Sequence, residues 1–383
     1  MRLAPIALVF LIAALPAAAA PGGLDPTFSG NGWVRTYEVS GARPYFPKGA
    51  EDVAIRPTGR SSRSASCRTP TATGGSASGA GSRTASYNAN GSIDSSFGSS
   101  GAARAAFPGS RCGCELHDLA VQRNGRIVAV GQRFRGSDAQ DDDPRAVARF
   151  LPNGQLDRSF SGDGRFSRDF GYGDDFGSSV AIQRDGKIVV GGVASFRYRS
   201  EADFAVVRLR PNGRLDRTFS GDGVKTVNFR GHRYDDLNGL DLQRDGHIVA
   251  AGSSTADFKG ADPKIAVLRL NRDGTLDRRF GRRLTEPGPH GGYARAILAD
   301  RSGRILVGGR AYDDSSHDAS AWALVSYRSS GALDRSFGKG GIVLGDFGTG
   351  ADWIGALAEQ PDGKVIAAGE VYRDQALARY LAR

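Results

Sequence analysis

The sequence is poor in cysteine and, beyond its first 20 residues, has no long apolar run. Three cysteines among 383 residues are too few for the disulfide framework of a small secreted domain, and a chain of this length does not need one. No later stretch approaches the roughly 18 apolar residues of a membrane-spanning helix. We therefore expect a chain that is stabilised by its hydrophobic core and does not span a membrane.

The motifs of common catalytic sites are also missing. The sequence has no Gly-x-Ser-x-Gly elbow, no His-Glu-x-x-His pair and no phosphate-binding glycine loop. Cys112, Cys114 and His117 lie in one short segment. Zinc needs four tetrahedral ligands, and the usual two-residue gap between cysteines is absent here. We interpret the two thiols as a free or oxidised pair in a loop, and we assign no catalytic residue.

The charge of the chain does not indicate a nucleic-acid-binding protein. The formal net charge is +10, from 51 Lys and Arg against 41 Asp and Glu. The basic residues are scattered through predicted turns, without a Lys/Arg-rich run and without an aromatic RNA-binding motif. We therefore expect no nucleic-acid partner.

The first 20 residues have the pattern of a secretory signal peptide. Arg2 is followed by an apolar run from Leu3 to Leu15, then by Pro16 and four alanines. Cleavage is expected after Ala19 or Ala20, because a small residue precedes the cut. The mature protein is predicted to begin near residue 21 and to be exported to the periplasm or the extracellular space.

Glycine is abundant, and this favours an all-β fold. The 54 glycines are about twice the average share, while 39% of residues are hydrophobic, which is ordinary. Glycine at this density is typical of many short strands that are joined by tight turns.

Two sequence motifs recur along the whole chain. Looking for such self-similarity first guards against misassigning a repeat protein. The first motif, Leu-Asp-x-x-Phe, begins at Leu24, Ile93, Leu156, Leu215, Leu276 and Leu333. The second, Gln-x-Asp-Gly followed by a Val/Ile run, begins at Gln122, Gln183, Gln243, Asp300 and Gln360.

A third motif completes a unit of about sixty residues. Segments such as AVARFLPNG begin at Ala146, Ala205, Ala266 and Ala323, and ALARY begins at Ala376. Each unit is predicted to contain four short strands that are separated by Asn-Gly and Asp-Gly turns, which is an antiparallel meander.

Six such units fill the mature chain and predict a six-bladed β-propeller in residues 21–383. The chain starts in the middle of a unit at Leu24 and stops after Tyr380, so that the two fragments make one unit. We expect the N-terminal strand to complete the last blade and close the ring, because closure removes exposed strand edges.

The recurring segments LDRSFSGDG at Leu156 and QRDGKIVVGG at Gln183 resemble the delta-60 repeat family. This family comprises predicted β-propeller repeats of exported bacterial proteins that are generally uncharacterised. The resemblance covers essentially the whole mature chain. It implies a propeller scaffold and provides no set of catalytic residues.

The first unit departs from the others in residues 61–86. This Ser/Gly-rich segment stands where two apolar strands belong, and a strand with almost no apolar side chain is not expected at the centre of a blade. One explanation is a degenerate or disordered blade segment. The other, which we favour, is a local shift of the reading frame.

The genetic code supports the shift. In a gene with G or C at third codon positions, reading one base earlier turns Ser codons into Val or Leu and Arg codons into Ala or Pro. The segment from Ser61 to Ser66 then resembles the strand from Ile127 to Gly131 in the next unit. The coding DNA distinguishes the two explanations: without a single-base insertion and a compensating deletion, the shift is wrong.

Residues that recur in every unit are interpreted as scaffold. We expect repeated ion pairs between the Arg of the third strand and the Asp of Leu-Asp-x-x-Phe. The arginines are Arg149, Arg208, Arg269 and Arg379, and the aspartates are Asp157, Asp216, Asp277 and Asp334. The Asp of Gln-x-Asp-Gly is expected to bond its own backbone in a turn.

Charge is predicted to separate between the two loop faces of the propeller. The face of the blade-entry loops carries acids: Asp138, Asp141 to Asp143, Asp174, Asp175, Asp235, Asp236, Asp313, Asp314, Asp318 and Asp352. The opposite face carries Arg123, Arg126, Arg278, Arg279, Arg282, Arg283, Arg301 and Arg304.

The acidic face is the predicted ligand surface. Carboxylates at the mouth of a propeller channel suit Ca²⁺, with Asp175, Asp236 and Asp352 as the candidate ligands, unless these residues only form a solvated acidic surface. Aromatic residues on the same face, Trp353 among them, are suited to stacking on sugar rings, although such residues also pack between blades.

The sequence thus predicts an exported, non-catalytic binding or interaction scaffold that acts as a monomer and binds an extracellular glycan or protein. The candidate binding residues are Asp174, Asp175, Asp235, Asp236, Asp352 and Trp353. The alternative is a calcium-dependent hydrolase or lactonase of the six-bladed type, which requires these carboxylates to converge around an open coordination position.

Overall fold

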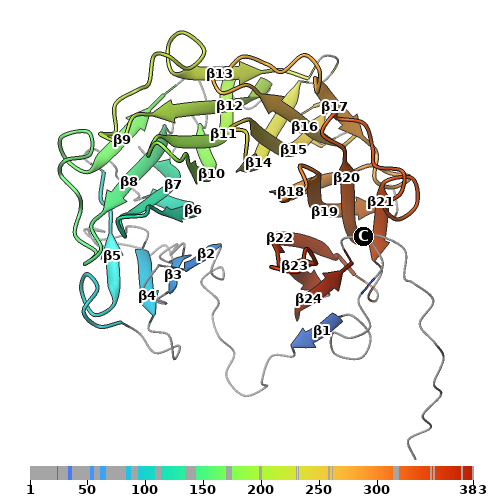
Figure 1. Cartoon of the computed structure of the whole chain (residues 1–383), viewed down its shortest axis with the longest axis horizontal. Helices are drawn as coiled ribbons and strands as arrows, with labels where there is room; N and C mark the ends of the chain where they lie inside the picture. The colour runs from blue at the N-terminus through green and yellow to red at the C-terminus, as the bar shows by residue number, and fades with distance from the viewer. Residues whose placement is uncertain are drawn as a thin grey trace, which may run out of the picture.

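The protein is an all-β, propeller-like fold built mainly of four-stranded sheets (Figure 1). The computed structural model describes residues 24, 33–36, 52–55, 61–65, 83–87, 94–107, 114–133, 144–169, 175–197, 201–229, 231, 233–257, 259–260, 262–313, 319–345, 347, 350–371 and 374–381. The predicted signal peptide lies outside these residues. No helix in the described part of the chain is long and apolar enough to cross a membrane.

The described residues form strands that are connected by turns, as the repeat predicted. The strands are β1 (Trp33–Thr36), β2 (Asp52–Ile55), β3 (Ser61–Ala65), β4 (Arg83–Tyr87), β5 (Ala102–Arg104), β6 (Cys114–Val121), β7 (Ile127–Arg133), β8 (Arg145–Phe150), β9 (Arg165–Arg168), β10 (Phe176–Ile182), β11 (Ile188–Arg197), β12 (Glu201–Leu209), β13 (Val224–Val227), β14 (Tyr234–Leu242), β15 (Ile248–Thr255), β16 (Lys264–Leu270), β17 (Arg282–Thr285), β18 (Gly292–Ala299), β19 (Ile305–Tyr312), β20 (Ser320–Tyr327), β21 (Ile342–Gly345), β22 (Trp353–Glu359), β23 (Val365–Val371) and β24 (Asp374–Tyr380).

The strands pair mostly with their sequence neighbours. Four-stranded sheets are formed by β2 to β5, by β6 to β9 and by β18 to β21, and β1 adds antiparallel to β24 at the edge of the sheet of β22 to β24. The strands β10 to β17 form one eight-stranded sheet, in which a single parallel bridge between Ala202 and Tyr234 joins two meanders. The predicted meander is therefore confirmed.

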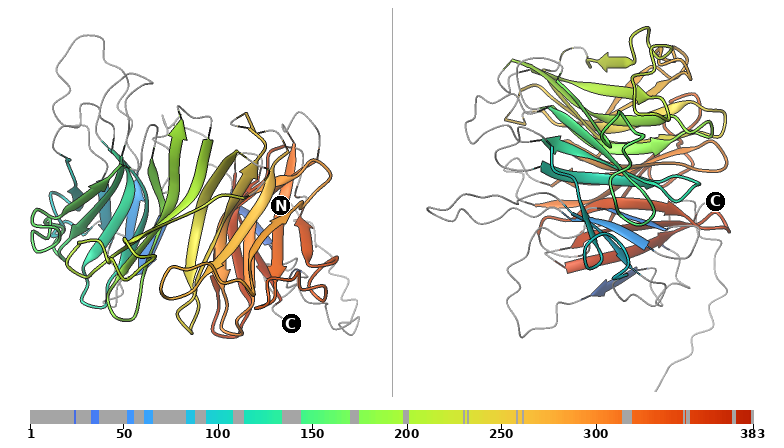
Figure 2. Two further views of the ribbon diagram at one scale, coloured as in Figure 1. Left: turned by 90° about the horizontal axis from the view of Figure 1, so that it is seen from above. Right: turned by 90° about the vertical axis from the view of Figure 1, so that its left-hand side faces the viewer.

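The sheets follow one another around an arc, with strands β6, β10, β14, β18 and β22 on its inner side (Figure 1). Their strands run between two faces that carry the turns (Figure 2). The core lies between neighbouring meanders: Phe204 and Val206 of one meander pack in one cluster with Leu237 and Ile248 of the next. Each sheet therefore needs its neighbour to bury its apolar residues.

A clamp between successive meanders is built on the Leu-Asp-x-x-Phe segment. Arg208 Nε donates to Asp216 Oδ2 at 2.8 Å, and both side chains are buried. The Arg208 guanidinium lies 4.7 Å from the centre of the Phe219 ring and also donates to the carbonyl of Arg272 in the following meander. The clamp thus combines an ion pair, a cation–π contact and a hydrogen bond between two meanders.

The ion pair and the cation–π contact recur in the preceding and the following repeat. Arg149 also donates to the Pro211 carbonyl of the next meander, whereas Arg269 donates its Nη1 to Gln243 of its own repeat. Nε of Arg149 bonds Asp157, and Nε of Arg269 bonds Asp277, each at 2.8 Å. Three of the predicted ion pairs are therefore confirmed. Asp334 instead bonds Arg328, because Ser326 replaces the arginine of the third strand. For Arg379, the corresponding Asp25 lies outside the described residues.

The environment of Asp216 favours its charged form. Burial alone raises the pKa of this carboxyl, but hydrogen bonds from Thr218 and the charges of Arg208 and Lys187 outweigh burial and lower the pKa to about 2. The clamp is therefore ionised throughout the neutral pH range.

Backbone contacts extend the clamp to the turn of the next meander. The Ser161 amide donates to the Asn212 carbonyl at 2.7 Å, and the Ser220 amide donates to the Asp273 carbonyl at 2.6 Å. Gly213 and Gly274, which have φ values of +83° and +85°, lie against the rings of Phe160 and Phe219. Glycine is required at these turns because a Cβ atom would collide with the ring.

The aspartates of the Gln-x-Asp-Gly turns bond their own backbone, as predicted. The amides of Lys187, His247 and Lys364 each donate to the aspartate two residues earlier, at 3.1 to 3.2 Å. These aspartates are therefore turn-forming residues.

The polar segment Ser61–Ala65 forms the second strand of its sheet. This differs from the prediction that a segment of such polar composition would not form a strand at the centre of a blade. Ile55 pairs with Ser61, and Ser61 pairs with Tyr87. In the next sheet Val121 pairs with Ile127, and Ile127 pairs with Phe150, in the same register. The polar strand thus takes the backbone position of an apolar strand. The frame shift itself stays a prediction.

Substitution of Gly213 tests the turn contact of the clamp. In G213A the new Cβ would lie 2.7 Å from Phe160 Cδ2 and from the Ser161 nitrogen, in a backbone conformation with positive φ. We expect the free energy of unfolding in urea to fall by about 1–2 kcal/mol for the positive φ and by about 1–3 kcal/mol more for the collision.

The control is G221A. Gly221 also has a positive φ, +93°, but its Cβ would meet nothing within 4 Å. It therefore carries the conformational cost alone, and equal losses in the two variants would contradict the packing of the turn glycine on the phenylalanine.

Candidate functional site

Three of the predicted binding aspartates occupy one repeated position at the start of the inner strands, and all three are buried. They are Asp175, Asp235 and Asp352. Asp235 accepts a hydrogen bond from the Phe229 amide at 2.7 Å and another from the Ser254 hydroxyl. Its carboxylate therefore fixes the loop that enters β14.

The other two aspartates bond the protein in the same manner. The Ser195 amide donates to Asp175 Oδ1 at 2.9 Å, and the Phe347 amide donates to Asp352 Oδ2 at 3.4 Å. Asp175 also lies near the fully buried Arg145, which donates to the Val193 carbonyl at 3.0 Å and so links two sheets. These carboxylates are turned toward backbone amides of the protein, from β11 for Asp175 and from the preceding loop for Asp352.

The candidate calcium ligands do not meet. Among the described residues, no group of three or more His, Cys, Asp or Glu side chains is placed to hold a metal ion. Asp174, Asp138, Asp141 to Asp143, Asp314 and Asp318 lie outside the described residues. His117, which sequence reasoning considered beside Cys112 and Cys114, instead hydrogen-bonds the Gly177 carbonyl through Nδ1 at 3.0 Å.

Asp236 and Trp353 lie in a different environment, which we call the inner aromatic cluster. Its members are Asp236, Tyr293, Arg295, Arg310, Tyr312 and Trp353. Asp236, Tyr293 and Trp353 occupy the same position of β14, β18 and β22, one residue before the start of a β-bulge. This shared register places them at one level on adjacent inner strands.

Arginine side chains connect the rings of the cluster. The Arg295 guanidinium lies 4.3 Å from the centre of the Trp353 ring. The Arg310 guanidinium lies 5.4 Å from Tyr293 and 4.8 Å from Tyr312, whose rings meet edge to face at 5.7 Å. The cluster is therefore an array of cation–π contacts that spans the sheets of β18 to β21 and β22 to β24.

The Asp236 carboxyl of the cluster is poorly hydrated, whereas the side chain of Arg295 retains contact with solvent. Burial raises the pKa of Asp236 to about 6, although the charge of Arg295 opposes the shift. Burial and the nearby charge of Arg310 lower the pKa of Arg295. Oδ1 of Asp236 is buried and has no hydrogen-bond partner in the described part of the chain. The cluster thus retains an acceptor for a ligand donor.

Sequence reasoning named Asp236 and Trp353 but missed Arg295 and Arg310. The bulge position that Arg295 occupies is His117, Ser178, Asn238 and Gly355 in the other repeats. Arg310 likewise stands where the repeats have Gln132, Val193, Ser253 and Glu370. The signal that could have found them is this departure from the repeat.

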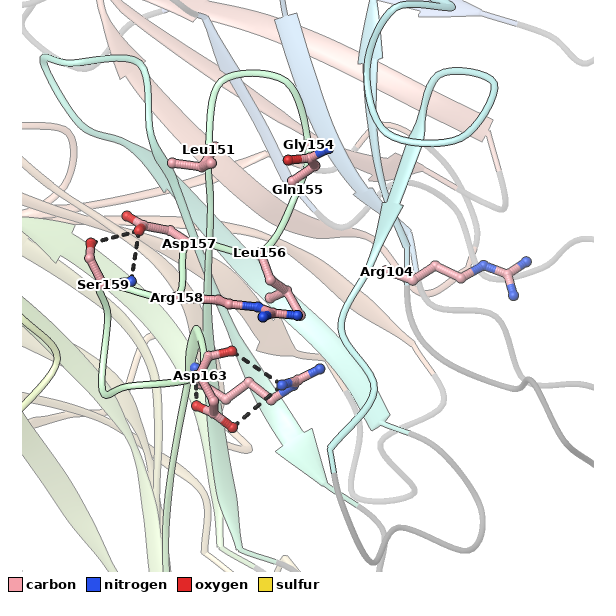
Figure 3. Close-up of a pocket in the computed structure, with 10 residues that line it drawn as sticks. Arg104, Leu151, Gly154, Gln155, Leu156, Asp157, Arg158, Ser159 and Asp163 are labelled. Carbon is pink, nitrogen blue, oxygen red and sulfur yellow. Dashed lines mark hydrogen bonds and ion pairs between the residues drawn. The ribbon is translucent and has the colours of Figure 1, made fainter.

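A pocket of about 780 Å³ lies elsewhere, beside the Leu-Asp-x-x-Phe segment that begins at Leu156 (Figure 3). Its acids are already engaged: Asp157 belongs to the clamp, and Asp163 bonds Arg165 at 3.4 Å. The side chain of Arg104 points away from the other labelled residues in Figure 3. We therefore assign this pocket to the scaffold.

The repeats match a known family. The sequence profile of the DUF5122 β-propeller, a domain of unknown function, matches residues 122–160, 183–219, 243–280 and 360–383. The resemblance to delta-60 repeats is thereby confirmed. No curated protein is significantly similar to the chain in sequence.

Several solved structures are similar to the chain at low identity. A protein of unknown function from Dyadobacter fermentans DSM 18053 is 9% identical, with a TM-score of 0.49, over 86% of this chain and 92% of that chain. A gluconolactonase from Xanthomonas campestris is 14% identical, with a TM-score of 0.39, over 78% of this chain and 79% of that chain.

The burial of Asp235 predicts a pH dependence of stability. Burial raises its pKa from 3.8 to about 6, despite the hydrogen bonds from Ser254 and Phe229. Between these two values the folded state holds the proton more tightly than the unfolded state, so the free energy of unfolding falls as the pH rises and is level above about 6. In D235N this contribution is absent.

We expect the stability of D235N relative to the wild type to increase by about 1–3 kcal/mol between pH 4 and pH 7, measured by urea unfolding. The matched control is D222N, in an exposed turn where Asp222 accepts from the Val224 amide. A pH profile of D235N that is parallel to the wild type would contradict the burial of this carboxyl.

Proposed function

The repeats of this chain belong to the DUF5122 β-propeller family, and we propose that the protein is an exported, non-catalytic scaffold that binds a glycan at the inner aromatic cluster. The N-terminal signal pattern supports export. Fold alone assigns no function, because propellers serve unrelated ones, so the proposal depends on the site.

One observation carries the proposal: the cluster is made of residues that do not recur. The recurring arginines, aspartates and phenylalanines hold the sheets together through the clamp. Tyr293, Arg295 and Trp353 instead break the repeat and meet on adjacent inner strands. Half-buried aromatic rings beside charged hydrogen-bonding groups are suited to the apolar face and the hydroxyls of a sugar.

No observation favours the alternative of a calcium-dependent hydrolase. That function required Asp175, Asp236 and Asp352 to converge. Asp175 and Asp352 accept hydrogen bonds from backbone amides, and Asp236 lies near Arg295.

We further propose that the propeller has six blades and that the sheet of β2 to β5 closes the ring against the sheet of β22 to β24. The pairing of β1 with β24, and the bridge between Leu24 and Tyr380, support this closure.

Leu377 of β24 provides a second argument for closure. Its counterparts in the other third strands are Val147, Val206, Val267 and Leu324. Each of these side chains is at most 1% exposed, because the next meander covers it. Leu377 itself is 39% exposed. A closed ring would cover this side chain as it covers the others.

Substitution of Leu377 tests closure. If the ring is closed, L377R places an unpaired charge between two sheets and lowers the free energy of unfolding by about 3 kcal/mol or more. The control is L344R on β21, where Leu344 is 48% exposed and a change within about 0.5 kcal/mol is expected. Equal and small effects in the two variants, measured by thermal and urea unfolding, would contradict closure.

Glycan binding is tested with a glycan array and titration calorimetry of the mature protein. We expect W353A and R295A each to weaken the binding of the selected glycan at least tenfold, which is about 1.4 kcal/mol, because each removes part of the stacking surface. The control Y234A shortens another half-buried aromatic residue at the start of β14, outside the cluster, and should bind within about twofold of the wild type. The absence of any bound glycan, or equal binding by W353A and the wild type, would contradict the proposal.

A further inference from the structure

A second pocket lies at the other end of the inner strands, between the turn that follows β10 and the turn that follows β14. Its volume is about 710 Å³. Ile182 and Leu242, the last residues of these two strands, contribute apolar surface, and both are partly buried. The walls come from adjacent repeats, so the pocket depends on the packing of one meander against the next.

Positive charge is in excess in this pocket. Five of its residues are cationic, Arg184, Lys187, Arg208, Arg244 and Arg272, and two are acidic, Asp185 and Asp273. Arg208 is paired with Asp216 of the clamp. Lys187 Nζ lies 3.3 Å from Asp185 and 3.4 Å from Asp216.

Arg184 and Arg244 are left without a carboxylate. Both are exposed, and neither has an ion-pair or hydrogen-bond partner in the described ranges of the chain. The equivalent residue in the next repeat, Arg301, shows why: its guanidinium lies 3.7 Å from Glu359 at the end of β22 and donates to the Pro361 carbonyl at 3.2 Å. Glu359 lies in the repeat that follows the repeat of Arg301. The same position is Leu242 in the repeat that follows Arg184 and Ala299 in the repeat that follows Arg244, and neither of these side chains carries a charge.

The pocket also holds an unused acceptor. Gln243 Oε1 accepts from Arg269 Nη1 at 3.2 Å, whereas Oε1 of the equivalent Gln183 is buried and has no hydrogen-bond partner among the described residues. The difference arises because Arg208, in the repeat of Gln183, donates its Nη1 to the Arg272 carbonyl instead. A buried acceptor without a donor is costly, and a hydroxyl of a ligand would satisfy it.

We propose that this pocket is a binding site for an anionic saccharide. Arg184 and Arg244 hold its sulfate, phosphate or carboxylate groups, Gln183 accepts from a hydroxyl, and Ile182 and Leu242 contact the apolar face of a sugar ring. Guanidinium groups suit such anions because their donors match two oxygens at once. The site is distinct from the inner aromatic cluster and does not rest on glycan binding there.

The experiment uses dextran sulfate, with neutral dextran of the same length as the uncharged probe. We expect calorimetry to show binding of dextran sulfate that weakens as salt is added, and no comparable binding of neutral dextran. The double variant R184A/R244A should bind at least about thirtyfold more weakly, since each arginine contributes about tenfold or slightly less through charge-assisted hydrogen bonds. Q183L, which leaves the net charge unchanged, should bind several-fold more weakly.

The charge-matched control is K225A/R233A, which removes two cations from the outer strand β13 and from the residue before β14. It should bind dextran sulfate within about threefold of the wild type. Equal losses in the two double variants would overturn the proposal, because they would indicate attraction by the net charge alone. Absence of binding, or equal binding of the two dextrans, would overturn it as well. W353A should bind dextran sulfate as tightly as the wild type does. A loss of glycan binding at the inner aromatic cluster can therefore be distinguished from a loss of binding in this pocket.

Discussion

The ion pair between the third-strand arginine and the aspartate of Leu-Asp-x-x-Phe is the interaction on which the structure depends. A meander of four short strands cannot bury both of its faces alone, so each must be held against the next. Arg208 contacts Asp216, the Phe219 ring and a carbonyl of the following meander at once. Removal of one partner from a buried pair typically costs about 3–5 kcal/mol, because the other charge is left without compensation.

This constraint determines which residues are available for function. The chain carries 51 Lys and Arg and 41 Asp and Glu, but many of the recurring ones are engaged in clamps and turns. The remaining candidates are residues that differ from their counterparts in other repeats, or that lack the partner which such a counterpart has. Arg295 and Trp353 at one end of the inner strands, and Arg184 and Arg244 at the other, belong to this set. The two proposed sites thus lie on opposite faces of one scaffold.

The sequence predicted the features that recur at equivalent positions of successive repeats. The strand order, the pairs Arg149–Asp157 and Arg208–Asp216, and the turn aspartates such as Asp185 were all accessible in this way. The direction in which the Asp235 carboxylate points could not be predicted in this way, because it depends on the position of the Phe229 amide in the preceding loop. The approach of Arg295 to Trp353 was not predicted either, since it requires the register of two adjacent inner strands and the bulge between Ala294 and Ala296. Both features arise from contacts between units, which a pattern within one unit does not contain.

Native-state hydrogen exchange of the clamp amides tests the central claim most directly. The amides of Ser161 and Ser220 lie in turns, but each donates to a carbonyl of the next meander. If the clamp holds neighbouring sheets together, these amides open only with the sheets, and NMR should find them protected to the same degree as amides of β12 and β15. Exchange at the rate of an exposed turn amide, while the strands stay protected, would contradict the account.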